Sequence, residues 1–286
     1  MTDLAQATIK HAPRRAVPRT TPVETVRSAD GTAIALERGG HGPPLILVDG
    51  ALCHRAMGPS TPLASLLAQH FTVFTYDRRG RGASGDAKPY AVQREIEDLQ
   101  VLINAAGGSA FVWGMSSGAA LALEAARQGS RISKLALYEP PFIVDASRPR
   151  IPTDIVAQLS TLVDGCQRDR AVRLFLRHMG APGIAIAVMR LLPLWRRLTP
   201  IANTLPYDMS IVSPYQTGTP LPTDRWCDVT IPTLVMVGGK SPTWFHHGTS
   251  ALTEAIPAAT HRVIKGQTHN VKATALAQPL TEFFDS

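Results

Sequence analysis

Short apolar runs alternate along this chain with segments whose apolar residues recur at helical spacing. Residues 45–48 and 233–237 are apolar at nearly every position, as expected for parallel strands that are buried on both faces, and 71–76 is predicted as a further strand. Helical spacing is found over 61–70, 92–103 and 273–284. This alternation predicts an α/β fold class: a doubly wound, mostly parallel sheet with helices on both faces.

Residues 142–230 interrupt the alternation. Prolines recur in this segment, and its periodic stretches are helical, most clearly at Val172, Phe175, Leu176 and Met179. Thr153 is expected to cap the first of these helices. An insertion of about ninety residues is far longer than an ordinary crossover connection. We therefore predict a core formed by 23–141 and 231–286, with 142–230 as a helical lid.

The first 22 residues are basic and contain Pro13 and Pro18 among their first twenty, without sustained periodicity, which predicts a flexible tail over 1–22. The tail lacks the apolar core of a secretory signal, and no stretch approaches about 20 uninterrupted apolar residues, so neither export nor stable membrane insertion is expected. Three widely spaced cysteines fit a reducing cytoplasm. The net charge of +7 is accompanied by no recognition motif, so no nucleic-acid partner is expected.

A strand-like apolar run leads into Gly114-Met-Ser-Ser-Gly118, and small residues and leucines follow. In a Gly-x-Ser-x-Gly turn between a strand and a helix, the central serine is strained and its hydroxyl is raised above the sheet edge. The spacing predicts Ser116 as a nucleophile, and Ser117 is expected to contribute only its backbone N–H. A chance match in a glycine-containing turn is the alternative.

The stretch Asp77-Arg-Arg-Gly-Arg-Gly-Ala-Ser84 is the most highly charged turn of the chain. No Gly-Lys-Ser/Thr sequence follows it, and its alternating glycines are typical of a compact turn between a strand and a helix. We therefore expect a structural turn here rather than a phosphate-binding loop.

Taken in order, four features resemble the α/β-hydrolase superfamily: a strand ending in Asp49-Gly50, the charged turn, the Gly-x-Ser-x-Gly turn, and the late Gly266-Gln-Thr-His269. The resemblance covers roughly residues 23–285. It implies that Ser116 is the nucleophile and His269 the general base and later acid. It also implies an oxyanion hole formed by the backbone N–H groups of Ala51 and Ser117. Such chemistry needs neither a metal ion nor an organic cofactor, and none is expected.

Two positions depart from the family pattern. Many relatives have histidine where this chain has Asp49, and a carboxylate near a developing oxyanion is unfavourable unless it points away or is paired. The loop that usually supplies the acid of a catalytic triad holds Lys240 and Ser241 but no Asp or Glu. Some relatives instead place the acid after the strand that follows the helix of the Gly-x-Ser-x-Gly turn, and Glu139 stands at the end of that strand. The resemblance therefore implies that Glu139 bonds the Nδ1 side of His269. A purely structural carboxylate is the alternative for Glu139, and Ser241 would then be the next candidate to orient the imidazole.

These features predict a serine hydrolase that cleaves an ester, thioester or lactone of a mostly apolar small molecule through an acyl-enzyme. The candidate lid lining is Phe175, Met179, Met189 and Trp195, which would favour an apolar acyl or polyketide-like substrate. Packing within the lid is the alternative for these four residues. The alternative is a hydrolase-fold protein that binds or cyclises a hydrophobic, polyketide-like ligand without acyl transfer. Carbon–carbon bond hydrolysis and cofactor-free perhydrolysis stay open, as do the substrate and the oligomeric state. A serine nucleophile argues against epoxide hydrolase and haloalkane dehalogenase chemistry, for which the family uses aspartate.

Overall fold

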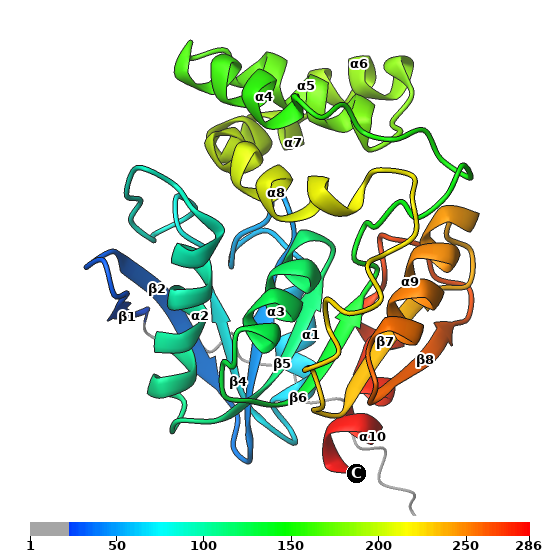
Figure 1. Ribbon diagram of the computed structural model, residues 1–286. Helices are drawn as coiled ribbons and strands as arrows, with labels where there is room; N and C mark the ends of the chain where they lie inside the picture. Colours follow the sequence, from blue (N-terminus) through cyan, green and yellow to red (C-terminus); the bar gives the residue numbers. More distant parts are fainter. Residues whose placement is uncertain (1–22) are drawn as a thin grey trace, which may run out of the picture.

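An eight-stranded sheet with the order β1-β2-β4-β3-β5-β6-β7-β8 forms the centre of the computed structural model, which describes residues 23–286 (Figure 1). The predicted tail over 1–22 lies outside the described residues. An antiparallel hairpin, β1 (Glu24–Arg27) and β2 (Ala33–Gly39), forms one edge and pairs antiparallel with β4. All other pairings are parallel. The remaining strands are β3 (Pro44–Val48), β4 (Thr72–Tyr76), β5 (Ala110–Met115), β6 (Ile132–Tyr138), β7 (Thr233–Gly238) and β8 (Ala259–Ile264).

Helices cover both faces of the sheet, because successive residues of each buried strand point to opposite sides. In β3, Leu45 and Leu47 pack with α1 (Ser60–Leu67) and α10 (Ala273–Asp285). Ile46 and Val48 belong to the larger cluster on the other face, formed with α2, α3 and α9. These three helices are α2 (Val92–Ala105), α3 (Ser117–Arg127) and α9 (Thr243–Ala255).

The neighbouring strands β3 and β5 are followed in the chain by β4 and β6, which lie on opposite sides of the pair in the order β4-β3-β5-β6. The direction of the chain connections therefore reverses between β3 and β5. In open α/β sheets a crevice forms outside the carboxyl ends of the strands at such a switch point. Asp49, Ser116 and Glu139 follow β3, β5 and β6 directly, so the topology brings all three to this edge. None of the helices between residues 23 and 286 is both long and apolar enough to cross a bilayer.

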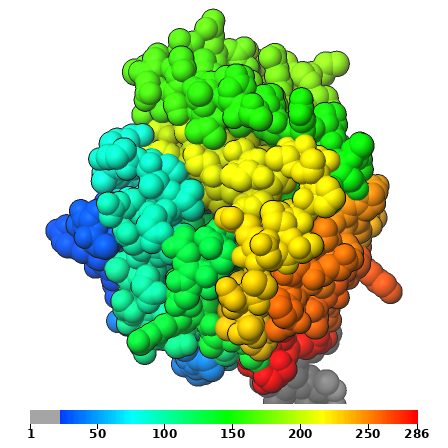
Figure 2. Space-filling view, in the orientation of Figure 1, coloured from blue at the N-terminus to red at the C-terminus, as the bar shows by residue number. Residues whose placement is uncertain are grey.

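Five α-helices and two short 3-10 helices, Thr199–Thr204 and Ser213–Tyr215, lie between β6 and β7 and form a layer above this edge (Figures 1 and 2). The α-helices are α4 (Ile155–Asp164), α5 (Arg168–His178), α6 (Gly183–Leu191), α7 (Pro193–Leu198) and α8 (Leu205–Val212). The sequence pattern predicts only the first three. The last two begin with Pro193 and with Leu205-Pro206, and proline within the first turn starts a helix rather than breaking it. The expectation for Thr153 was wrong, because Asp154 precedes α4 and no side chain caps the helix.

Candidate active site

Ser116 occupies a sharp turn between β5 and α3. Its φ of 56° and ψ of −126° lie in a region that side-chain-bearing residues seldom adopt, and such strain persists only where the surroundings enforce it. A Cβ added to Gly118 would lie 2.3 Å from the carbonyl oxygen of Val48, and one added to Gly114 would lie 2.6 Å from that of Gly118. Both glycines are therefore required by close backbone approach, as the Gly-x-Ser-x-Gly spacing predicts.

Glu139 contacts the imidazole of His269. The Glu139 Oε2 atom lies 2.7 Å from His269 Nδ1. The other carboxylate oxygen, Oε1, accepts hydrogen bonds from the Gly238 N–H at 2.7 Å and from the Ser241 hydroxyl at 2.5 Å. Glu139 is fully buried and has a φ of 47°. The two alternatives drawn from the sequence are therefore compatible, because one oxygen is bound to the protein framework and the other to the histidine. Ser241 contacts Glu139 rather than the imidazole.

His269 lies in the loop after β8, and its ring stacks on Phe245 with 4.8 Å between the ring centroids. The Tyr138 hydroxyl donates a 2.7 Å hydrogen bond to the carbonyl of Thr268 and so restrains this loop. Ser116 and His269 line the same cavity. Within residues 23–286 the Ser116 hydroxyl forms no hydrogen bond, and catalytic contacts of this kind often tighten only when substrate is bound.

The peptide between Gly50 and Ala51 lies beside Ser116, and both of its residues line the cavity. The Arg81 Nη1 atom donates a 2.6 Å hydrogen bond to the Gly50 carbonyl. This peptide bond is trans, so its N–H points away from Arg81. Ala51 lines the cavity, and neither its N–H nor that of Ser117 is bonded within the described residues. Two free backbone donors therefore lie near Ser116. Leu52, the residue after Ala51, has a positive φ of 58°.

The side chain of Asp49 is directed toward Ser60 and not toward the backbone donors of Ala51 and Ser117. Its Oδ1 atom accepts hydrogen bonds from the hydroxyl of Ser60 at 2.7 Å and from the Ser60 N–H at 3.3 Å, at the start of α1. The side chain is buried and is not among the residues that line the cavity. Burial raises the pKa of Asp49 to about 6, against the opposing effect of the two Ser60 hydrogen bonds. The unfavourable approach of the Asp49 carboxylate to a developing oxyanion, considered from the sequence, is therefore avoided because the side chain is directed toward Ser60.

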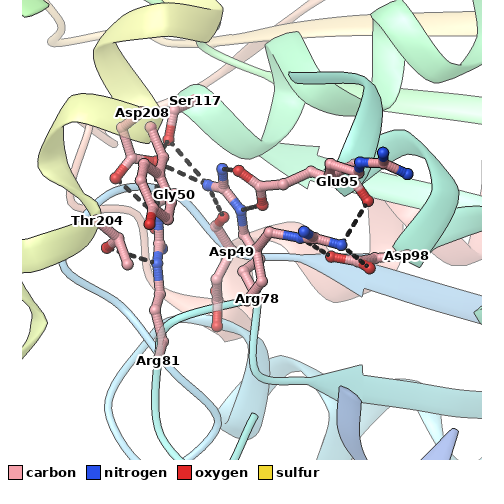
Figure 3. A network of polar contacts seen from close by, with 12 residues as sticks. Asp49, Gly50, Arg78, Arg81, Glu95, Asp98, Ser117, Thr204 and Asp208 are labelled. Carbon is pink, nitrogen blue, oxygen red and sulfur yellow. Dashed lines mark hydrogen bonds and ion pairs between the residues drawn. The ribbon is translucent and has the colours of Figure 1, made fainter. Parts of the chain in front are cut away.

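The three arginines of the charged turn are at most 2% exposed, and each binds at least one carboxylate. Figure 3 shows Arg78 and Arg81 with their partners. Arg78 donates two 2.7 Å hydrogen bonds to Glu95, and Arg79 donates two of the same length to Asp98. The turn therefore has a structural role, as its glycine pattern indicates. Its guanidinium groups bind carboxylates inside the protein and are not available to bind phosphate.

Asp208, in the inserted helix α8, joins this network to the Ser116 turn (Figure 3). Its carboxylate accepts hydrogen bonds from Arg78 at 2.8 Å, from Arg81 at 2.7 Å and from the Ser117 hydroxyl at 2.7 Å. Burial by itself would raise the pKa of Asp208, but the two guanidiniums hold it below its usual value. Sequence reasoning missed Asp208, because no motif surrounds it. The only signal was the surplus of arginines in a turn expected to be compact.

The cavity above Ser116 has a volume of about 1110 Å³. Its wall on the side of the inserted helices is apolar and consists of Phe175, Leu176, Met179, Met189, Leu194 and Leu198. Three of the four side chains expected to line a lid are therefore present. Trp195 was wrongly included, because it packs inside the insertion, where its indole N–H donates a 2.9 Å hydrogen bond to Asp169. Among residues 23–286 no three His, Cys, Asp or Glu side chains are grouped as metal ligands.

Comparison with known proteins agrees with this architecture. Residues 39–285 match the alpha/beta hydrolase family. An alpha/beta hydrolase from Sphaerobacter thermophilus DSM 20745 is 49% identical, with 91% of this chain and 100% of that chain covered and a TM-score of 0.84. A hydrolase from Pseudomonas aeruginosa PA01 (21% identity, 92% and 98% covered, TM-score 0.68) and an enol-lactonase from Burkholderia xenovorans LB400 (18%, 92% and 100%, 0.67) share the fold.

Proposed function

Because the chain belongs to the α/β hydrolase family, we propose that it is a serine hydrolase that cleaves an ester, thioester or lactone of a largely apolar small molecule through an acyl-enzyme. One observation carries the proposal: the 2.7 Å contact between Glu139 Oε2 and His269 Nδ1, in a cavity that also exposes the strained Ser116. Nucleophile, base and orienting carboxylate are recognised by such geometry rather than by their order in the sequence.

In this mechanism the Ser116 hydroxyl attacks the substrate carbonyl, and the Nε2 atom of His269 accepts its proton. A serine hydroxyl is a poor nucleophile near neutral pH, and an imidazole removes that obstacle because its pKa lies near the working pH. Glu139 holds the proton on Nδ1, which fixes the tautomer and stabilises the imidazolium as it forms. His269 then returns the proton to the leaving group, and water releases the acid by the same route.

The negative charge that develops on the carbonyl oxygen would be stabilised by the N–H groups of Ala51 and Ser117. Both are free donors beside Ser116, and the Ser117 N–H lies at the N-terminus of α3, where the helix dipole favours negative charge. We further infer that the inserted helices serve as a lid, since their apolar side chains form one wall of the cavity. An apolar wall favours a substrate with an apolar body.

Two sequence features motivated the alternative of a hydrophobic-ligand binder or cyclase without acyl transfer. These were the missing acid after β7 and the presence of Asp49. Neither favours it now, because Glu139 contacts His269 from the end of β6 and Asp49 is turned toward Ser60. The alternative is kept as an outcome of the experiment below.

The proposal is tested with a fluorophosphonate probe and 4-nitrophenyl esters of short fatty acids. The wild-type protein is expected to be labelled and to hydrolyse the esters, and Ser116→Ala to lose labelling and at least about 10⁴-fold in kcat. Ser65→Ala, which changes an exposed serine of α1, is the matched control and should behave as wild type. Labelling of a folded Ser116→Ala protein would place the nucleophile elsewhere. A wild-type protein that is neither labelled nor active would favour the non-hydrolytic alternative.

A further inference from the structure

Arg148 lies at the start of the insertion, and its half-buried side chain lines the cavity that holds Ser116 and His269. Its guanidinium covers the ring of Trp244, with 4.3 Å between Cζ and the ring centroid. One donor, Nη2, is directed to the backbone carbonyl of His178. Within the described part of the chain, 23–286, Arg148 forms no ion pair with a carboxylate.

This lack of a carboxylate partner sets the half-buried Arg148 apart from the buried arginines. Arg55, Arg78, Arg79 and Arg81 all bind carboxylates. Charges that are taken out of water are normally paired, because desolvation is costly. Burial accordingly lowers the pKa of Arg148, with no carboxylate to oppose the effect. A guanidinium has five N–H donors, and those that Arg148 does not use on His178 remain available for an anion.

A continuous wall of stacked side chains links Arg148 to the reacting groups. Beyond Arg148, the ring of Trp244 stacks on Phe245 with 3.6 Å between centroids, and Phe245 stacks on His269 at 4.8 Å. All four side chains line the cavity. A ligand whose carbonyl lies at Ser116 can therefore extend along aromatic surface and end at an unpaired cation.

We propose that Arg148 binds a carboxylate at the far end of the substrate, so that the substrate is the ester, thioester or lactone of an acid that carries a second, ionised carboxyl group. The planar guanidinium matches a carboxylate in a two-point contact, and its stacking on Trp244 leaves the N–H edge free. This inference rests on the proposed hydrolase function and names its substrate class. The second cavity-lining cation, Lys272, is exposed and provides the internal comparison.

The kinetic test compares mono-4-nitrophenyl esters of glutaric, adipic and suberic acid with the length-matched esters of pentanoic, hexanoic and octanoic acid. At one of these lengths the wild-type protein should prefer the anionic ester in kcat/KM. Arg148→Gln should lower the ratio of anionic to neutral kcat/KM at least about tenfold, the usual effect of losing a charge-assisted hydrogen bond. Arg148→Lys should restore part of the preference, because it restores the charge but not the fork.

Arg150→Gln is the matched control, because it removes an exposed arginine two residues away and should leave the ratio unchanged. Thermal unfolding of each variant shows whether it folds. The inference is overturned if the protein hydrolyses neutral esters but shows no Arg148-dependent preference for the anionic esters at any length. It is equally overturned if the preference disappears in Lys272→Gln and not in Arg148→Gln. In both cases the proposed hydrolase function survives.

Calorimetric binding to Ser116→Ala tests Arg148 independently of turnover. Monomethyl suberate should bind at least about tenfold more tightly than neutral dimethyl suberate, and adding Arg148→Gln should remove the difference. Equal affinities for the two suberates would refute the anion site. If the wild-type protein hydrolyses no ester while Ser116→Ala still discriminates through Arg148, the proposed function fails and the anion site stands.

Discussion

The hydroxyl of Ser117 donates a 2.7 Å hydrogen bond to Asp208, although 91 positions separate the two residues. The sequence predicts that Ser117 contributes only its backbone N–H, but its side chain also ties the first turn of α3 to the inserted helix α8. The residue next to the proposed nucleophile therefore has two separable roles, one through its backbone and one through its hydroxyl.

Ser117→Ala is expected to lower the free energy of unfolding by about 1 kcal/mol, because the hydroxyl's 2.7 Å hydrogen bond to Asp208 and the longer 3.3 Å one from Arg78 are lost while both arginines still bind Asp208. The kcat of ester hydrolysis should fall by no more than a few-fold, since the N–H remains. Urea denaturation and steady-state kinetics measure the two effects. A folded variant that is as inactive as Ser116→Ala would contradict this division of roles.

Arg81 is expected to act as a positioning residue, because it fixes the Gly50 carbonyl and hence the direction of the Ala51 N–H. Arg81→Lys keeps the positive charge near Asp208, but a single ammonium group cannot bind Asp208 and the Gly50 carbonyl at once as the planar guanidinium does. We expect kcat to fall about 10- to 100-fold, less than the loss of an entire oxyanion donor, with a smaller change in KM.

Arg79→Lys provides the control for this variant, because Arg79 is equally buried but binds Asp98 and Asp30, away from the Gly50 loop. It should cost stability without slowing the reaction of Ser116 with the fluorophosphonate. Equal slowing by both substitutions would show that Arg81 acts through general stability alone.

Glu139→Gln is expected to fold and to lose up to about 10⁴-fold in kcat. The amide oxygen can still accept from Gly238 and Ser241, but the amide nitrogen would then face the Nδ1 of His269 and favour the wrong tautomer. Ser241→Ala, which removes one hydrogen bond to the carboxylate and leaves the others, should lose far less activity. Comparable losses in the two variants would argue against a direct role of Glu139 on the imidazole.

Asp49→Asn is expected to change how stability depends on pH. Because the folded pKa of about 6 lies above the ordinary value of 3.8, the folded protein holds this proton more tightly than the unfolded chain. The stability that the proton supplies is complete below the unfolded pKa and is lost as the pH rises through 6. An amide does not ionise and has no such loss. Between pH 4 and pH 8 the free energy of unfolding of the variant, relative to that of the wild type, should therefore rise by on the order of 2–3 kcal/mol.

Urea unfolding of both proteins at pH 4.5 and pH 8 measures this gain. A difference in unfolding free energy between the variant and the wild type that stays constant with pH would show that Asp49 does not change its ionisation on folding.

Local patterns were enough to predict the strand order along the chain, the turn around Ser116 and the placement of His269 after the last strand. These features depend on neighbouring residues: consecutive apolar positions, glycines at a fixed spacing, and a loop after a strand. The start of α9 at Thr243 is not marked by such a pattern, because the helix follows Pro242 without an apolar period in its first turn.

The partners of the arginines could not be predicted, because they depend on contacts across the fold. Nothing near Asp208 or Glu95 in the sequence indicates that either binds Arg78. The same holds for Trp195, whose apolar character predicts burial but not which side of a helix faces the cavity. Glu139 could be proposed only through the family resemblance, because some relatives place the acid after this strand. Its hydrogen bonds on both carboxylate oxygens depend on contacts with residues at the end of β7 and in the loops after β7 and β8.

The Asp208 carboxylate makes the inserted helices a poor candidate for exchange between relatives. Replacing the segment between β6 and β7 by one without a carboxylate at this place would leave Arg78 and Arg81 with an unbalanced buried charge directly beneath the Gly50 loop. A chimeric hydrolase of this kind would lose stability in its folded core, in addition to any change in its substrate preference. The inserted segment and the charged turn are therefore energetically coupled. An exchange that succeeds will either keep a carboxylate at position 208 or change positions 78, 81 and 208 together.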